Sequence, residues 1–253
     1  MEQTFDFSEI RPYEGEEVAA AAARLCGEEL FRKAVAYVVP DTETFFRVLA
    51  SCRTVDAFQF QLALPCLQAL VKNTSAGLTA SGFSALSPQK CYTYISNHRD
   101  ITLDSAFLNV ALHEAGLDTC EIAIGDNLLI YPWIVDFVRL NKSFIVNRSV
   151  SRRQMLEVSC RLSAYMHHAI HDKKQSIWIA QREGRAKNSD DRTQESLIKM
   201  LGLTGNGDLV ENLKEINIMP VSISYEYDPY DYIKTHKFLP KRDNPHFKKT
   251  HHA

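Results

Sequence analysis

One histidine in a short polar run is the first candidate for chemistry in this chain. The run reads Asn97-His98-Arg99-Asp100, and a second aspartate, Asp104, follows it. A histidine can take a proton from an incoming hydroxyl group when a carboxylate holds its other ring nitrogen in the right tautomer. Both aspartates are near enough in sequence to provide that carboxylate. The alternative interpretation is a loop histidine that pairs only locally, with Asp100.

The flanking residues predict a strand before the polar run and a helix after it. Residues 92–95 are β-branched or aromatic, which suits a short strand. The helix is indicated by apolar residues at helical spacing, namely Phe107, Val110, Ala111 and Ala115. Asp104 is the expected N-cap of this helix, and Gly116 is its expected stop. The polar run therefore lies at the carboxyl end of a strand, where ligands and catalytic groups gather in an open α/β sheet.

Strands and helices alternate through the rest of the chain. We predict strands at 121–124, 143–146, 176–180 and 218–224, and helices at 132–139 and 151–170. Crossovers of this length predict an α/β fold with a mostly parallel β-sheet flanked by helices. Residues 1 to about 85 favour helices, at 16–26, 28–39, from Asp41 onward and at 55–71. We divide the chain into an N-terminal helical module (1–87), an α/β domain (88–235) and a basic tail without helical or strand period (236–253).

Polar loops follow three more of the predicted strands. One holds Arg148, another runs from Gln181 to Asn188, and a third follows Pro220. In a parallel sheet these loops share one edge with His98, because every crossover returns the chain in the same direction. Guanidinium groups there suit an acceptor that carries phosphate and whose hydroxyl group the histidine can activate. Taken singly, Arg148 is also explained as a surface charge at a helix start.

Four segments together resemble the sequence blocks of the glycerolipid acyltransferases, which include glycerol-3-phosphate and lysophosphatidate acyltransferases. The family's first block is a histidine followed by an aspartate, often introduced by Asn-His, and the second ends a strand in an arginine, as residues 144–148 do. The third contains Glu-Gly and then arginine, as in Glu183-Gly184-Arg185. The fourth is an apolar strand around a proline, here Pro220. All four occur in the family's order between residues 92 and 226.

Two blocks depart from the family pattern. The family has four residues between the histidine and the aspartate, whereas five separate His98 from Asp104. Either one residue bulges from the loop, or Asp100 replaces Asp104 as the orienting carboxylate, and Asp104 is the preferred assignment. The third block reads Gln-Arg-Glu-Gly-Arg in place of Phe-Pro-Glu-Gly-Thr-Arg, so that either Arg182 or Arg185 corresponds to the family's arginine.

The resemblance implies acyl transfer from an acyl thioester, on coenzyme A or acyl carrier protein, to the hydroxyl group of a phosphorylated glycerol or lysophospholipid, as in phospholipid biosynthesis. His98 would be the general base and Asp104 would fix its tautomer. Backbone donors near Glu183 and Gly184 would stabilise the oxyanion. The acceptor would be bound by Arg148, Arg182, Arg185, Lys187 and Pro220. No cofactor is implied beyond the coenzyme A or carrier-protein co-substrate.

Composition sets limits on partners and compartment. The net charge of -2 gives no global basic field, so nucleic acid is not expected as a partner. The six cysteines are scattered and the N-terminus is acidic, which indicates reduced thiols in a cytoplasmic protein. No apolar run approaches the ~20 residues that cross a bilayer. We therefore expect at most a peripheral contact with the inner membrane face, for which the basic tail is one candidate.

Histidines also gather at the end of the long predicted helix. His167 and His171 share a face at i,i+4 spacing, as zinc ligands can, with His168 and Asp172 beside them. No glutamate general base lies between the two histidines, and a helix C-terminus is by itself favourable for histidine. We therefore expect no metal site.

The apolar run 128–138 is the remaining feature of note. It contains an aromatic pair around Pro132 and is expected to be core under the sheet. The functional alternatives are one wall of an acyl-chain pocket or an interfacial membrane contact.

Two other classes of function compete with this reading. One is an acyltransferase-like module that binds a phosphorylated lipid or a partner without catalysis, which the shifted aspartate spacing favours. The other is an acyltransferase with a different acceptor, such as an amine-bearing amino acid or a sugar lipid. A serine or cysteine hydrolase is disfavoured, because no nucleophile comes with a recognisable partner.

Overall fold

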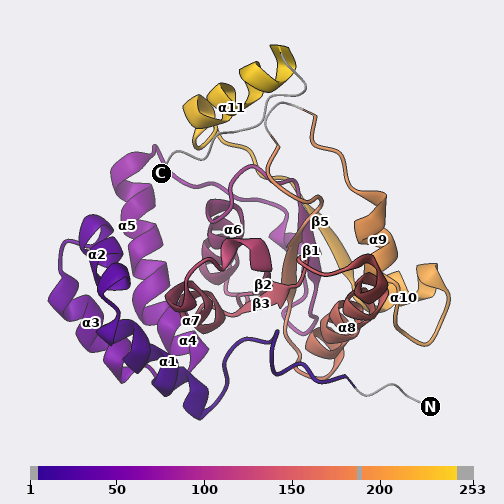
Figure 1. The fold of residues 1–253 in the computed structure, drawn as a ribbon, viewed down its shortest axis with the longest axis horizontal. Coiled ribbons are helices and arrows are strands. Elements are labelled where there is room, and N and C mark those ends of the chain that lie inside the picture. The colour runs from indigo at the N-terminus through magenta and orange to yellow at the C-terminus, as the bar shows by residue number, and fades with distance from the viewer. Residues whose placement is uncertain (1–4, 187–189, 244–253) are drawn as a thin grey trace.

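A five-stranded, all-parallel sheet forms the centre of the molecule (Figure 1). The computed structural model describes residues 5–186 and 190–243. In the spatial order β3-β2-β4-β1-β5, the strands are β3 (Ser143–Val146), β2 (Glu121–Gly125), β4 (Ile177–Ala180), β1 (Thr93–Ser96) and β5 (Ile218–Val221). The predicted α/β fold is confirmed. Because Ser96 pairs with Ala180 on one side and Val221 on the other, three strands end at the same level.

Helices cover both faces of the sheet and carry the chain between parallel strands. They are α6 (Leu103–Glu114), α7 (Pro132–Leu140), α8 (Arg152–His171), α9 (Glu195–Leu201) and α10 (Leu209–Glu215). Strand residues alternate between the two faces: Ile177 and Ile179 pack with α8, whereas Trp178 packs in the cluster that contains Leu112 of α6. The sequence analysis did not predict α9 and α10, which are only seven residues each.

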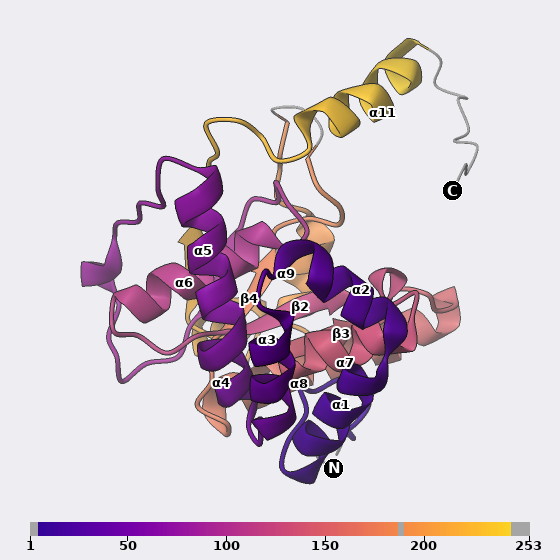
Figure 2. The ribbon, with the colours of Figure 1, turned by 90° about the vertical axis from the view of Figure 1, so that its left-hand side faces the viewer.

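The N-terminal helices build a second core beside the sheet (Figures 1 and 2). They are α1 (Glu16–Gly27), α2 (Glu29–Val38), α3 (Thr42–Ser51), α4 (Val55–Phe58) and α5 (Leu64–Thr74), with a π-helical turn at Gln59–Ala63. Leu140 belongs to this core, and Trp133 and Phe137 pack against it. The run 128–138 therefore does not simply lie under the sheet, because α7 turns its aromatic side chains toward the N-terminal helices.

Both ends of the described chain differ from the sequence prediction. Residues 5–15, expected to be helical, form no helix, and the Ile10 carbonyl accepts a hydrogen bond from the Ile145 N–H of β3 at 2.9 Å. At the other end, α11 (Asp231–Asp243) stands away from the body (Figure 2). The first part of the predicted irregular tail is thus helical. The remainder, 244–253, lies outside the described residues.

Candidate active site

The turn between β1 and α6 carries the polar run. Asp100 is buried and caps the helix, since its Oδ1 accepts hydrogen bonds from the N–H groups of Thr102 and Leu103, both at 2.9 Å. These amides belong to the first turn, which has no partners of its own for them. Asp104, the expected N-cap, is instead the second residue of α6, so that prediction was wrong. With the cap supplied by Asp100, Asp104 turns its side chain inward.

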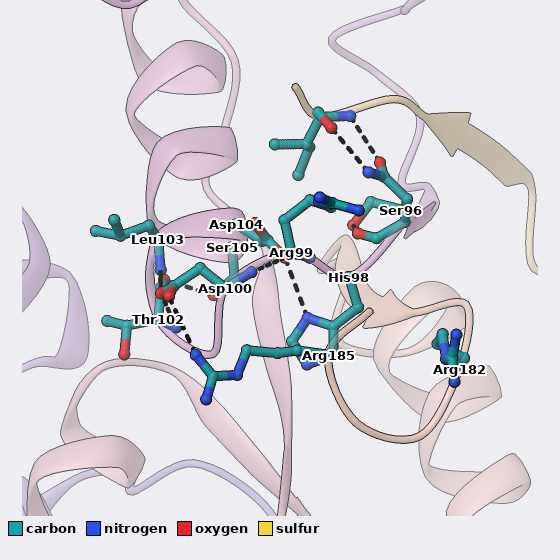
Figure 3. Close-up of polar contacts among 12 residues, drawn as sticks. Ser96, His98, Arg99, Asp100, Thr102, Leu103, Asp104, Ser105, Arg182 and Arg185 are labelled. Carbon is teal, nitrogen blue, oxygen red and sulfur yellow. Dashed lines mark hydrogen bonds and ion pairs between the residues drawn. The ribbon is translucent and has the colours of Figure 1, made fainter. Parts of the chain in front are cut away.

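Asp104 is the carboxylate that contacts the histidine (Figure 3). Its Oδ2 lies 3.1 Å from Nδ1 of His98 and also accepts hydrogen bonds from the N–H groups of Arg99 at 2.7 Å and Asp100 at 2.9 Å. The Asp104 side chain is 0% exposed. Donors of this kind offset the cost of burying a negative charge. The turn accommodates the five-residue spacing by wrapping two main-chain amides around the carboxylate.

The His98 ring is held in one orientation. Because Nδ1 faces Asp104, Nε2 is the nitrogen in position to exchange a proton with a substrate. The ring lies edge-on to Trp178 of β4, with 6.2 Å between ring centroids. The side chain is 12% exposed, so it is packed by protein and still reaches the surface.

The loop after β4 fixes the main chain of His98. The His98 N–H donates to Asp191 Oδ2 at 3.1 Å, and its carbonyl accepts from the Ala186 N–H at 2.8 Å. Directly after β4, the Gln181 N–H donates to the Ser96 carbonyl at 2.8 Å. The sequence analysis missed Asp191, because no motif or spacing marks a carboxylate so far along the chain.

The loop after β5 reaches the same turn. The Asn97 side chain exchanges two hydrogen bonds with the main chain of Ile223, at 2.8 and 2.7 Å. The Tyr225 hydroxyl donates to the second oxygen of Asp104, Oδ1, at 2.8 Å. Burial, together with the negative charge of Asp104, raises the pKa of Tyr225 well above its usual range. The hydroxyl therefore keeps its proton and remains a donor.

The start of α11 completes this arrangement. Asp228 forms ion pairs with Arg99 and with the buried Lys234, and the Lys234 ammonium group also donates to the Arg99 carbonyl. Residues 223–234 thus cover the histidine turn, and we call them the C-terminal strap. Three segments that are far apart in sequence, the histidine turn, the loop after β4 and this strap, meet at one edge of the sheet, as the parallel topology predicts.

Arg148 lies where β2 and β3 end. Its guanidinium group packs against Gly125, where an added Cβ atom would lie 3.4 Å from the guanidinium carbon. The guanidinium group is 3.5 Å from Glu183 Oε1, in the loop after β4. Glu183 is largely exposed, which makes this ion pair easy to exchange for a bound anion.

The other predicted cations differ in placement. Arg185 lies 3.7 Å from Asp100 Oδ2, close to His98, with its guanidinium group 5.8 Å from the ring centre of Tyr230 (Figure 3). Arg182 lies on the other side of the loop and donates to the Asp190 carbonyl at 3.0 Å. Lys187 lies outside the described residues. Arg185, rather than Arg182, is therefore the arginine beside the histidine turn.

A known protein family matches the part of the chain that holds this turn. The sequence model of the family described as Acyltransferase matches residues 78–224, which is more than half of the chain. The chain belongs to this family, the glycerolipid acyltransferases. The resemblance inferred from four sequence blocks is thus confirmed. No curated protein matches the chain.

The family match divides this acyltransferase into matched and unmatched parts. Residues 78–224 contain all five strands and the turn that holds His98 and Asp104. Helices α1–α5 and most of the C-terminal strap, including Tyr225, lie outside it. Across the part of the chain that the structure describes, no helix of this acyltransferase has the length and apolarity needed to cross a membrane.

The remaining predicted site residues of the acyltransferase lie near the same edge. Pro220 is within β5, paired in register with Ile95, one residue before the strand ends. The Glu183 N–H donates to Gln194 Oε1 at 2.7 Å, so this amide is already engaged. Gly184 has a left-handed φ of 71° and open space at its Cβ position. Because Gly184 has no Cβ atom, a substrate can approach the main chain of this loop closely.

Proposed function

We propose that this acyltransferase moves an acyl group from an acyl thioester, on coenzyme A or acyl carrier protein, to the hydroxyl group of a phosphorylated glycerol or lysophospholipid. His98 acts as the general base. The observation that carries the proposal is the contact of His98 Nδ1 with the buried Asp104, which directs Nε2 toward the substrate side. General base catalysis of this kind typically contributes ~10² to 10⁴ in rate.

In the proposed reaction, His98 carries one proton from the acceptor hydroxyl group to the leaving thiolate. Nε2 of His98 takes the proton of the acceptor hydroxyl group as the oxygen attacks the thioester carbonyl carbon. The tetrahedral intermediate then expels the thiolate, which receives the same proton from the imidazolium ring. Asp104 holds the ring and stabilises its charged form. The Gly184 amide is the proposed donor to the oxyanion.

The acceptor phosphate is assigned to Arg148 and Arg185. Arg148 is paired with an exposed carboxylate, Glu183, and Arg185 lies 3.7 Å from Asp100 at the histidine turn. Forked guanidinium donors match the oxygens of phosphate well. Arg182 is less suited, because its guanidinium group already donates to Asp190.

The test measures release of free thiol from one acyl-coenzyme A, or from acyl carrier protein, with matched acceptors. These are glycerol 3-phosphate against glycerol, and lysophosphatidate against monoacylglycerol. We expect turnover only with the phosphorylated member of a pair, and a loss of ~10² to 10⁴ in kcat for His98→Ala. For Arg148→Ala we expect a higher KM for the phosphorylated acceptor. The control is Arg47→Ala, at an exposed position of α3, which should behave as wild type.

Three results would contradict the proposal. Undiminished turnover by a folded His98→Ala variant would remove the general base. Equal rates with and without phosphate would favour an acceptor of another class, such as an amine-bearing amino acid or a sugar lipid. Binding of phosphorylated lipid without thiol release from either donor would favour a non-catalytic module.

A further inference from the structure

Two histidines and a glutamate come together at the end of the molecule opposite the candidate active site. His167 and His171 lie one turn apart on α8, with 6.0 Å between ring centroids, and Glu215 is the last residue of α10. Helix α8 leads into β4, and α10 is followed by β5. Their ends therefore lie at the amino-terminal edge of the parallel sheet, whereas His98 lies at the carboxyl-terminal edge.

The distance between His167 and Glu215 fits a bound metal ion better than a direct hydrogen bond. One ligand atom from each of the three residues lies within 4.8 Å of the others. Nδ1 of His167 is 3.6 Å from Glu215 Oε2, which is too long for a hydrogen bond. Ligands about 2.0–2.2 Å from a tetrahedral zinc ion lie about 3.3–3.6 Å from one another. The gap between imidazole and carboxylate is thus of the size that a zinc ion spans.

The chemistry of the three side chains also suits a zinc ion. Two imidazoles and one carboxylate are ligands that suit Zn²⁺ and leave a fourth position for water. Nε2 of His167 is buried and has no hydrogen-bond partner among the described residues.

We propose that His167, His171 and Glu215 form a zinc site that joins the end of α8 to the end of α10. The sequence analysis expected no metal here, because no glutamate lies between the two histidines and a helix C-terminus is by itself favourable for histidine. Glu215 is brought to them by the fold. A bound ion would cross-link α8 to the connection between β4 and β5, residues 181–217, which includes the loop that fixes His98.

Zinc titration of the full chain tests this proposal. The protein is freed of metal with a chelator and titrated with ZnCl₂ by calorimetry, and its thermal unfolding is followed with and without zinc. Because His251 and His252 can bind the same ion, every variant carries His251→Ala and His252→Ala. We expect one equivalent of zinc to bind and to raise the unfolding temperature by several degrees, since a ligand that binds only the folded state stabilises it.

Three variants make the test specific. His171→Ala and Glu215→Gln should lose zinc binding and the temperature shift. His168→Ala, which changes a neighbouring histidine that pairs with Asp172 at 2.7 Å, should keep both. Circular dichroism checks that each variant is folded, and Co²⁺ in place of zinc should give the strong visible absorption of a four-coordinate site. Absence of saturable binding, or binding that survives in folded His171→Ala and Glu215→Gln, would overturn the proposal.

Discussion

Asp104 is the residue on which the geometry of the histidine turn depends. It accepts hydrogen bonds from two main-chain amides and from Tyr225, besides its contact with His98. A buried carboxylate with this many donors is fixed in position, so it in turn fixes the imidazole. Asp100, the other candidate in sequence, is turned toward the helix start. The two aspartates are therefore expected to respond differently to substitution.

Asp104→Asn should lower kcat by roughly 10³ to 10⁴ with little change in fold, because an amide facing Nδ1 favours the wrong tautomer. Asp100→Asn is the matched control. Asparagine caps a helix about as well as aspartate, so this variant should keep a kcat near that of wild type. Thiol-release kinetics decide between them, and a larger loss for Asp100→Asn would reverse the assignment of the orienting carboxylate.

Tyr225 is a positioning residue that acts through Asp104. Tyr225→Phe removes one hydrogen bond to a charged group, worth about 1.5–3 kcal/mol, and should lower kcat about 10- to 100-fold. KM for the acceptor should change little, because the hydroxyl group contacts Asp104 and not the proposed phosphate site. Tyr227→Phe, in the same strap and 82% exposed, is the control. An unchanged kcat for Tyr225→Phe, or an effect confined to KM, would exclude the positioning role.

The histidine and its aspartate could be paired from sequence because they are neighbours in the chain. The partners that fix them could not, since sequence separations of 93 residues for His98–Asp191, 126 for Asn97–Ile223 and 121 for Tyr225–Asp104 leave no local pattern. The same limit applies to Glu215. Side chains that meet only through the tertiary fold become visible only when the fold is known.

At the scale of elements, the periodicity of apolar residues predicted helices and strands correctly where it extended over several turns or followed a clear pattern. The strand after Tyr92 and the helix that ends before Gly116 follow the predicted pattern closely. The short helices α9 and α10 gave too few turns for an apolar period to emerge. A capping box between Asp208 and Glu211 was the signal that could have revealed α10.

Asn109 joins two of the elements that position the site. This buried side chain of α6 donates to the Cys120 carbonyl at 3.2 Å and accepts from the Cys120 N–H at 2.8 Å, immediately before β2. Asn109→Ala leaves two main-chain groups without partners, so the free energy of unfolding should fall by roughly 2–4 kcal/mol. Urea unfolding measures the change, with the exposed Asn73→Ala on α5 as control. A loss equal to that of the control would show that the bridge is not needed.

At the scale of the whole molecule, α7 belongs to two cores. Leu140, Trp133 and Phe137 pack with the N-terminal helices, whereas Val135 packs against the cluster of the sheet and α8. The boundary predicted near residue 87 follows the change in sequence texture and stays a prediction, and α7, which lies after it, packs with the helices before it. Elements that share a core are expected to unfold together.

The two tryptophans allow a direct test of this coupling, because Trp133 reports on the N-terminal core and Trp178 on the sheet. In Trp133→Phe and Trp178→Phe backgrounds, each signal is followed alone during thermal unfolding, and the two midpoints should coincide. Phe58→Ala, at a fully buried position of α4, should cost about 3–5 kcal/mol and lower both midpoints equally. Tyr37→Ala, 92% exposed on α2, should change neither. If Phe58→Ala lowered only the Trp133 midpoint, the N-terminal helices would be an independent folding unit, and the shared α7 would not couple them to the sheet.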